Sequence, residues 1–444
     1  MTLFNRIAAG IPAFLAGAFL LAAPAAAIEV QEVTSPGGIT AWLVEEHGLP
    51  IISLDAGFDG GGRIDPEGKT GLAFLVSTLM NEGAGDFDST AFAEKLEEKA
   101  FSFGGSADQD AFYLSLTTLS DNKADAFELM RLAIASPRFD QEAIDRMKAQ
   151  IVAGIQEADQ DPSSVAGNTW QAGAFPGHPY GLKVRGTVET VSGITRDDIA
   201  AFMGQALGRD KLKVVVVGDI TAAELGPLLD TMFASVPATR GLADPAEITM
   251  QNTGKTQIVE MNVPQSVIQF GSPGLKATDP EFRAAQVLNY TLGGGGFASR
   301  MMKEIRAKRG LTYGVGTGFA TERLTEYFYG GLATDNKTAG EALGLVKAEI
   351  QKFRDEGITD EELADAKAYL TGSFALRFDS NAKISNILLS YFLSGFPKDY
   401  INTRNPEIEA VTKDQVNAAA KRLLDPAQLY VVVVGKPEGV TATP

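Results

Sequence analysis

The chain has 444 residues, no cysteine and a formal net charge of −17, and 45% of its residues are hydrophobic. The missing cysteines exclude disulfides and thiolate metal sites, so stability has to come from a buried core. The negative charge disfavours nucleic acid and anionic membrane surfaces as partners. The length predicts two or more domains.

The N-terminal segment, residues 1–27, has the pattern of a targeting segment. Arg6 is the only charged residue before an uncharged run from Ile7 to Ile28, and Pro24–Ala27 lies near its end. A basic start, an apolar middle and small residues predict a secretory signal, cleaved after Ala27. The mature chain is therefore expected to be exported to the periplasm, without stable membrane insertion. The run is long enough to span a bilayer, so an uncleaved anchor is the alternative.

Strands and helices follow in the first predicted domain, residues 28–236. A polar segment with Pro, Gly and Asp, residues 237–255, is the predicted linker, and residues 256–444 form the second domain. The expected strands are Ile39–Glu46, Ile51–Gly57, Ala111–Leu119 and Lys213–Val217, the first two joined by a hairpin turn at His47-Gly48. The expected helices are Lys69–Met80, Thr90–Lys99, Asp121–Ala135, Asp140–Asp159 and Thr195–Gln205.

The second domain repeats the plan of the first. Three local patterns recur in the same order, which chance does not readily produce. They predict two similar α+β domains, each a mixed sheet backed by helices. The pairs are Val214–Gly218 with Val431–Gly435 and Ile194–Asp198 with Val411–Gln415, both at the same offset along the chain, and the helices holding Lys148 and Lys367, at almost the same offset.

A glycine run, Gly293–Gly296, leads into a short cationic helix that breaks at Gly310, just before Tyr313. Arg306 lies seven residues before Tyr313, and the chain turns between them, so both side chains can point into one space. A guanidinium fork and a phenol can together hold a peptide carbonyl or a developing oxyanion. The alternative is a surface cation beside a half-buried core tyrosine.

The stretch Leu292–Val315 resembles the second half of the M16 metallopeptidases, the family of pitrilysin, insulinase and mitochondrial processing peptidase. In that family an Arg and a Tyr seven residues apart follow a glycine-rich turn. The resemblance implies two domains that face each other across a cleft. It also implies that Gly294, Gly295 and Phe297 line the path of a bound peptide, although a flexible turn would explain the glycines equally well.

The zinc motif of that family is missing from the first domain. Family members place His-x-x-Glu-His on a helix after Gly-x-Ala, so that two His bind zinc and the Glu activates water. Here Gly71–Ala73 is followed by Phe74 and Thr78 at the His positions and Ser77 at the Glu position. The third ligand position aligns with residue 153 or 154, an Ala or a Gly. No metal or other cofactor is therefore expected in this chain.

The histidine content supports the same expectation. The chain has two histidines, His47 in the expected hairpin turn and His178 in the turn Gly177–Gly181, too few for a hydrolytic zinc site of the usual kind. Residues 62–70 come close to a phosphate-binding loop, but Asp65 stands where phosphate would lie. The glycine run follows a predicted helix, Pro280–Leu292, rather than a strand, which disfavours a dinucleotide site.

The resemblance therefore implies a non-catalytic subunit of an exported heterodimeric zinc peptidase. Its partner would be an M16 subunit with His-x-x-Glu-His and the zinc. Arg306 and Tyr313 would hold peptide substrate and stabilise the oxyanion in the partner's site. The alternatives are a structural scaffold of the same fold, like the core subunits of the cytochrome bc1 complex, and a solitary peptide-binding protein.

Overall fold

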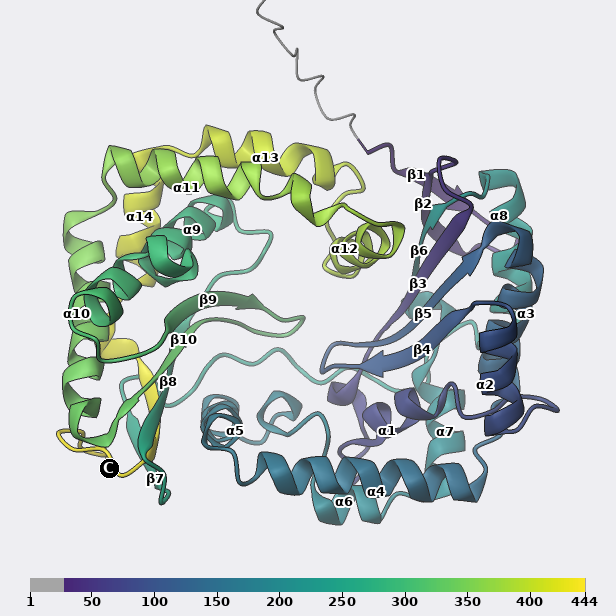
Figure 1. Cartoon of the computed structure of the whole chain (residues 1–444), viewed down its shortest axis with the longest axis horizontal. Helices are drawn as coiled ribbons and strands as arrows, with labels where there is room; N and C mark the ends of the chain where they lie inside the picture. The colour runs from purple at the N-terminus through teal and green to yellow at the C-terminus, as the bar shows by residue number, and fades with distance from the viewer. Residues whose placement is uncertain (1–27, 444) are drawn as a thin grey trace, which may run out of the picture.

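The computed structural model describes residues 28–443, and the predicted signal segment of residues 1–27 lies outside the described residues. Two α+β halves, each built around one sheet, face each other (Figure 1). The strands of the first half are β1 (Gln31–Thr34), β2 (Thr40–Glu45), β3 (Ile51–Asp59), β4 (Ser102–Ala107), β5 (Ala111–Leu119) and β6 (Leu212–Gly218). Its helices are α1 (Leu72–Leu79), α2 (Ser89–Glu98), α3 (Lys123–Ala135), α4 (Gln141–Ala158), α5 (Pro162–Ala174), α6 (Val188–Ser192), α7 (Arg196–Ala206) and α8 (Ala222–Met232).

The second half has one strand fewer. Its strands are β7 (Thr256–Glu260), β8 (Gln265–Pro273), β9 (Val315–Thr321), β10 (Glu326–Asp335) and β11 (Tyr430–Gly435). Its helices are α9 (Phe282–Asn289), α10 (Ala339–Glu356), α11 (Asp360–Gly372), α12 (Asn381–Leu393), α13 (Tyr400–Ala410) and α14 (Lys413–Leu423). No helix among residues 28–443 combines the length and the apolar character that crossing a membrane requires.

The two sheets have the same topology. The strand order is β1-β2-β6-β3-β5-β4 in the first sheet and β7-β11-β8-β10-β9 in the second. The pairs β2–β6 and β7–β11 are parallel, and the other pairs are antiparallel. The registers also correspond, because Asp55 lies opposite Val215 and Gln269 lies opposite Val432. Two mixed sheets backed by helices confirm the fold class expected from the repeat.

Equivalent side chains make equivalent contacts in the two halves. Thr195 and Thr412 each begin a helix with a capping box, α7 in one half and α14 in the other. Lys148 on α4 donates to the carbonyl oxygen of Ser192 at 2.8 Å, and Lys367 on α11 donates to that of Glu409 at 2.8 Å. The internal repeat therefore extends to individual hydrogen bonds.

The expected hairpin at His47 is wrong. Strands β2 and β3 do not pair with each other, because β6 lies between them, parallel to one and antiparallel to the other. His47 instead lies in an exposed connection, with its Nδ1 2.7 Å from Asp219 Oδ1, and this contact raises its pKa. A strand inserted from a later part of the chain leaves no signal in the local sequence.

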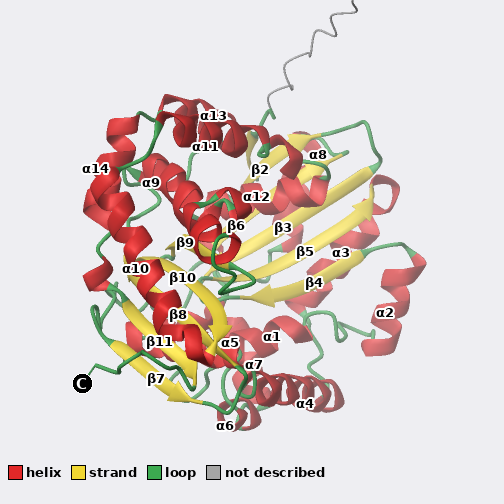
Figure 2. Cartoon of the chain, turned by 60° about the vertical axis from the view of Figure 1, so that its left-hand side comes forward, coloured by secondary structure: helices red, strands yellow, loops and turns green. Residues whose placement is uncertain are grey.

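Each half contributes one helix to the sheet of the other half. Helix α5 packs on β8 and β11 of the second sheet, and α12 packs on β3 and β6 of the first sheet. Figure 1 shows α12 beside the first sheet and α5 beside β8. Figure 2 shows α12 in front of the first sheet, on the face opposite α3 and α8. The starts of the two helices, Pro162 and Asn381, have the same offset as Lys148 and Lys367, so the exchange is part of the repeat.

The helix exchange explains why β6 and β11 are apolar on both faces. In β6, Val214 and Val216 face the first core, whereas Val215 and Val217 pack with residues of α12. The second sheet follows the same alternation, with α5 on the inner face of β11. Trp42 stacks on Phe392 with a centroid distance of 4.1 Å. Both faces of each central strand are therefore buried.

Candidate functional site

Arg306 and Tyr313 lie on the surface of the second half. Arg306 is in a π-helical turn, Met302–Ala307, and its guanidinium carbon lies 4.3 Å from the centroid of the Phe297 ring. Phe297 is 70% exposed and Tyr313 is 84% exposed. The structure thus brings Arg306 and Phe297 together, and within residues 28–443 no hydrogen bond joins either of them to Tyr313.

The loop that carries Tyr313 is fixed on both sides. Gly310, at a φ of +65°, ends the helical turn and reverses the chain. The amide of Leu311 donates to the carbonyl of Ile305 at 3.1 Å. The buried Thr312 donates to the carbonyl of Ala333 in β10 at 2.7 Å. The backbone is therefore anchored on both sides of Tyr313, and it holds the phenol at the surface.

At three positions of the glycine run, close packing leaves no room for a side chain. A Cβ on Gly293 would lie 2.5 Å from Oγ1 of Thr317, and one on Gly295 would lie 2.6 Å from the carbonyl oxygen of Tyr290. A Cβ on Gly294 would likewise meet a neighbouring amide at 2.4 Å. These close approaches within the chain account for the glycines, and contact with a peptide at Gly294 and Gly295 stays a prediction.

Helix α1 carries the positions of the zinc motif. Asp65 accepts hydrogen bonds from the amides of Gly71, Leu72 and Ala73 at 2.8, 3.2 and 2.9 Å. The carboxylate of Asp65 therefore accepts from the amides at the start of this helix, at the place where a phosphate-binding loop would hold its phosphate.

The residues at the ligand positions do not fit a zinc ion. Phe74 has no donor atom for a metal, and the hydroxyls of Ser77 and Thr78 donate to carbonyl groups one turn earlier, each at 2.7 Å. The guanidinium carbon of Arg185 lies 5.2 Å from the centroid of the Phe74 ring. Its Nη1 is 3.8 Å from the place where a Cβ on Gly154 would be. An exposed cation therefore lies beside the positions aligned with the first and third ligands.

A pocket of about 580 Å³ adjoins Arg185 and lies between the two halves. Its walls come from α4, α5 and the segment before α6 on one side, and from β8 and β10 on the other. Neither Arg306 nor Tyr313 lines this pocket. The lining residues are Gly154, Ile155, Ala158, Asp159, Ser164, Gly167, Asn168, Trp170, Gln171, Lys183, Val184, Arg185, Gly186, Gln269, Tyr327 and Tyr329.

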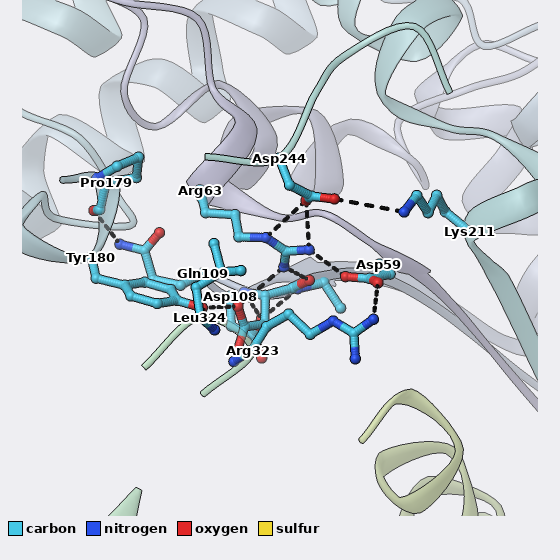
Figure 3. Close-up of polar contacts among 12 residues, drawn as sticks. Asp59, Arg63, Asp108, Gln109, Pro179, Tyr180, Lys211, Asp244, Arg323 and Leu324 are labelled. Atoms are coloured by element: carbon cyan, nitrogen blue, oxygen red, sulfur yellow. Dashed lines mark hydrogen bonds and ion pairs between the residues drawn. The ribbon is translucent and has the colours of Figure 1, made fainter. Parts of the chain in front are cut away.

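A polar cluster joins the halves next to the β9–β10 turn (Figure 3). The side chain of Arg63 is fully buried and forms ion pairs with Asp59, Asp110 and Asp244. From the second half, the amide of Arg323 donates to Asp110 Oδ2 at 2.8 Å. Ion pairs and hydrogen bonds thus hold the turn of the second half against the first.

The same cluster contains His178 and a half-buried acid, Glu322. His178 contacts the Ala246 carbonyl oxygen at 2.9 Å through Nε2, and its Nδ1 accepts from the amide of Tyr180. His178 therefore serves as a hydrogen-bonding residue of the turn Gly177–Gly181. Burial, together with the negative charge of Asp110, raises the pKa of Glu322 to about 8. Nothing in the local sequence indicated that the acids Glu322 and Asp110 would lie next to each other.

These features define a class of protein: two repeated α+β halves around a pocket, with a helix at the position of a zinc motif that carries none of its ligands. Two family models match the chain. Residues 52–188 match insulinase (peptidase family M16), and residues 193–370 match the peptidase M16 inactive domain. The chain belongs to peptidase family M16.

Known proteins resemble the chain over nearly all of its length. A crystal structure of a peptidase M16 inactive domain from Pseudomonas fluorescens is 29% identical, with a TM-score of 0.86, over 94% of this chain and 99% of that one. A Helicobacter pylori protein named non-peptidase homolog YmxG is 27% identical over 88% of this chain and 90% of its own length. A Streptomyces coelicolor protein named an uncharacterized zinc protease is also 27% identical, over 89% and 87%. The match to an inactive domain and the lost ligands are consistent with a non-catalytic member of the family.

Proposed function

We propose that this chain is the non-catalytic subunit of an exported heterodimeric M16 peptidase. Its partner is an M16 subunit with the His-x-x-Glu-His motif, and the zinc belongs to that partner. This chain holds no cofactor, binds the peptide substrate and supplies Arg306 and Tyr313 to the partner's site. The complex works in the periplasm after the signal segment has been removed.

The half-buried Arg306 and the exposed Tyr313 carry this proposal. Both lie outside the pocket of their own chain, and Tyr313 is 84% exposed on an anchored loop. Arg, Tyr and Phe side chains are the residue types that dominate the energetics of protein interfaces. A surface with the contacting pair Arg306 and Phe297 and with the exposed Tyr313 therefore suits contact with a second subunit.

In the shared site, the two residues act on the peptide backbone. The guanidinium of Arg306 and the phenol of Tyr313 donate hydrogen bonds to a carbonyl oxygen of the bound peptide. These bonds strengthen as that oxygen becomes negatively charged, which lowers the barrier to hydrolysis. Phe297 contacts the guanidinium, and within residues 28–443 no hydrogen bond occupies its N–H groups. Gly294, Gly295 and Phe297 line the approach of the peptide.

A peptide-binding protein without a peptidase partner is the second candidate. The pocket between the halves, of about 580 Å³, favours it, because this volume is typical of small-ligand sites. A scaffold that only assembles with other subunits needs neither the pocket nor Arg306 and Tyr313.

Co-expression with an exported M16 subunit that has the zinc motif, encoded by a neighbouring gene, tests the proposal. The two chains should elute together with an interface larger than about 1,000 Å² and cleave peptides that neither chain cleaves alone. Elemental analysis of the separated subunits should find the zinc with the partner. Full activity of the partner alone would contradict the proposal, and a stable complex without activity would favour the scaffold.

A further inference from the structure

The pocket between the halves has polar walls. Asn168 and Gln171 on α5 and Gln269 on β8 are half-buried and line it. Within residues 28–443 their side-chain amides make no hydrogen bond to other protein groups. Because these amides have no protein partner and line the pocket, a ligand that enters it meets several donors and acceptors.

Arg185 gives the pocket an uncompensated positive charge. Within residues 28–443 it forms no ion pair, whereas the other cation of the pocket, Lys183, is paired with Asp159. The Arg185 guanidinium lies against Phe74, and within residues 28–443 it makes no hydrogen bond, so its N–H groups are available to a ligand. A lone cation in a chain with a net charge of −17 favours an anionic ligand.

We propose that this pocket binds the C-terminal carboxylate of a peptide through Arg185. The guanidinium lies between Phe74 and Gly154, the positions that align with two ligands of the family's zinc site. The positive centre of the pocket is thus a side chain rather than a metal ion. It anchors the end of a peptide and does not cleave it.

The chemistry of the walls favours a peptide end over other anions. A planar guanidinium pairs with a carboxylate through two parallel hydrogen bonds. One free charge matches a monoanion, whereas a phosphate dianion calls for more cations. The three amides match the N–H and C=O groups of a peptide backbone. Tyr327 and Tyr329 add aromatic surface for side chains on the opposite wall.

This inference rests on the proposed peptide-binding role, but it concerns a different surface from Arg306 and Tyr313. Its test therefore uses the mature chain alone, without the peptidase partner. If the mature chain does not bind the peptide carboxylate, the outcome of the co-expression experiment is not affected. A failure of that experiment likewise leaves carboxylate binding to be measured independently.

Fluorescence anisotropy with N-terminally labelled hexapeptides tests the inference. One peptide ends in leucine as the free acid, a second is its C-terminal amide, and a third is an amide that ends in aspartate. The acid should bind the wild-type chain at least roughly tenfold more tightly than either amide, since a hydrogen bond to a charged group contributes about 1.5–3 kcal/mol. The preference should vanish in Arg185→Ala, whereas Lys95→Ala, an exposed cation on α2, should retain it.

Gly167→Leu provides a second variant that blocks the pocket. A Cβ at Gly167, on α5, would meet no atom within 4 Å, so a larger side chain can enter the pocket without disturbing the packing. It should abolish binding of the acid while the melting temperature stays near that of the wild-type chain. Equal binding of acid and amide, no binding of any peptide at millimolar concentration, or unchanged binding in Arg185→Ala would overturn the inference. Equal binding of the aspartate amide and the acid would overturn the assignment to a C-terminus.

Discussion

The guanidinium of Arg306 lies 4.3 Å from the centre of the Phe297 ring, and no carboxylate among residues 28–443 forms an ion pair with it. An exposed cation–π contact contributes about 0.5–1 kcal/mol, so the arrangement orients the side chain more than it stabilises the fold. Tyr313 contributes less still, because most of its surface is in water. Arg306 and Tyr313 are therefore free to serve a ligand or a second protein.

Substitution of Arg306 or Tyr313 should separate activity from stability. Arg306→Ala and Tyr313→Phe should change the melting temperature little, because neither side chain fills the core. In the reconstituted complex, each should lower kcat by about 10²–10³, the usual effect of losing one oxyanion donor. Arg306→Lys should restore activity only in part, because an ammonium lacks the planar fork.

The matched control for these variants is Lys303→Ala, which removes an exposed cation from the same helical turn. It should retain both assembly, followed by gel filtration, and turnover of a peptide substrate. Wild-type turnover in intact complexes of the Arg306 and Tyr313 variants would show that Arg306 and Tyr313 have no part in the chemistry.

At the scale of elements, the β9–β10 hairpin connects the two halves through its turn. Glu322 in this turn is half-buried beside Asp110 and Asp108 of the first half. Burial and these two negative charges raise its pKa, so its carboxyl holds a proton near neutral pH. Loss of this proton places two negative charges in contact and weakens the docking of the hairpin.

The stability of the chain should therefore fall as the pH rises. The pKa of Glu322 is raised from 4.5 to about 8, so its contribution to stability is complete below pH 4.5 and is lost as the pH approaches 8. Between pH 6 and pH 9, thermal melts of the wild-type chain should show a decrease on the order of a few degrees. Glu322→Gln, which cannot ionise, should show a smaller decrease.

Glu326→Gln, at the start of β10 in the same hairpin, is the control for loss of a glutamate. It should follow the pH dependence of the wild-type chain. If Glu322→Gln and the wild-type chain lost stability in parallel between pH 6 and pH 9, the proton on the acid pair would not support the docking.

The sequence predicted several strands and helices of the first half whose side chains pack within that half. Strand β5 has its expected ends, and β6 extends one residue beyond its prediction at each end. Strand β4 lacks an alternating pattern because Gly104 and Gly105 lie in its centre. A Cβ on Gly105 would be 2.5 Å from the carbonyl oxygen of Ser77, so this strand lies directly against α1. Such a close approach depends on the fold and leaves no local pattern.

The candidate site was predictable only in part, for the same reason. The spacing of Arg306 and Tyr313 is a local pattern and could be recognised. The contact of Arg306 with Phe297 follows from turns whose geometry the sequence does not specify. The residues next to Arg185 in the sequence do not indicate a site, because its role depends on α1 and α4 lying beside it in the fold.

At the scale of the whole molecule, the halves are repeats in sequence but not independent bodies in space. Helix α12 covers Trp42, Val215 and Val217 on the first sheet, and α5 covers the corresponding face of the second. The indole of Trp170 on α5 donates to the carbonyl of Tyr430 in β11 at 3.1 Å. Residues 237–255 also bond to both halves, through Gln251 and Ile248 among others.

Fragments cut in this segment should fail to fold alone. A fragment of residues 28–236 exposes the apolar face that α12 covers, and we expect it to aggregate or to lack a cooperative thermal transition. Co-expression with residues 256–444 should restore a soluble complex with one transition, because both exchanged helices regain their sheets. Gel filtration and circular dichroism measure both outcomes. A monomeric first fragment that melts cooperatively would show that the exchange is dispensable.

The helix exchange also determines when the chain can fold. Ser385 on α12 donates to Asp55 on β3, two residues separated by 330 positions in the sequence. Contacts of such long range make folding slow, because a large loop must close before they form. During synthesis, the face of the first sheet that α12 covers stays exposed until nearly the whole chain has been made. The growing chain therefore presents an apolar surface and depends on protection from aggregation and proteases until its last quarter has been made.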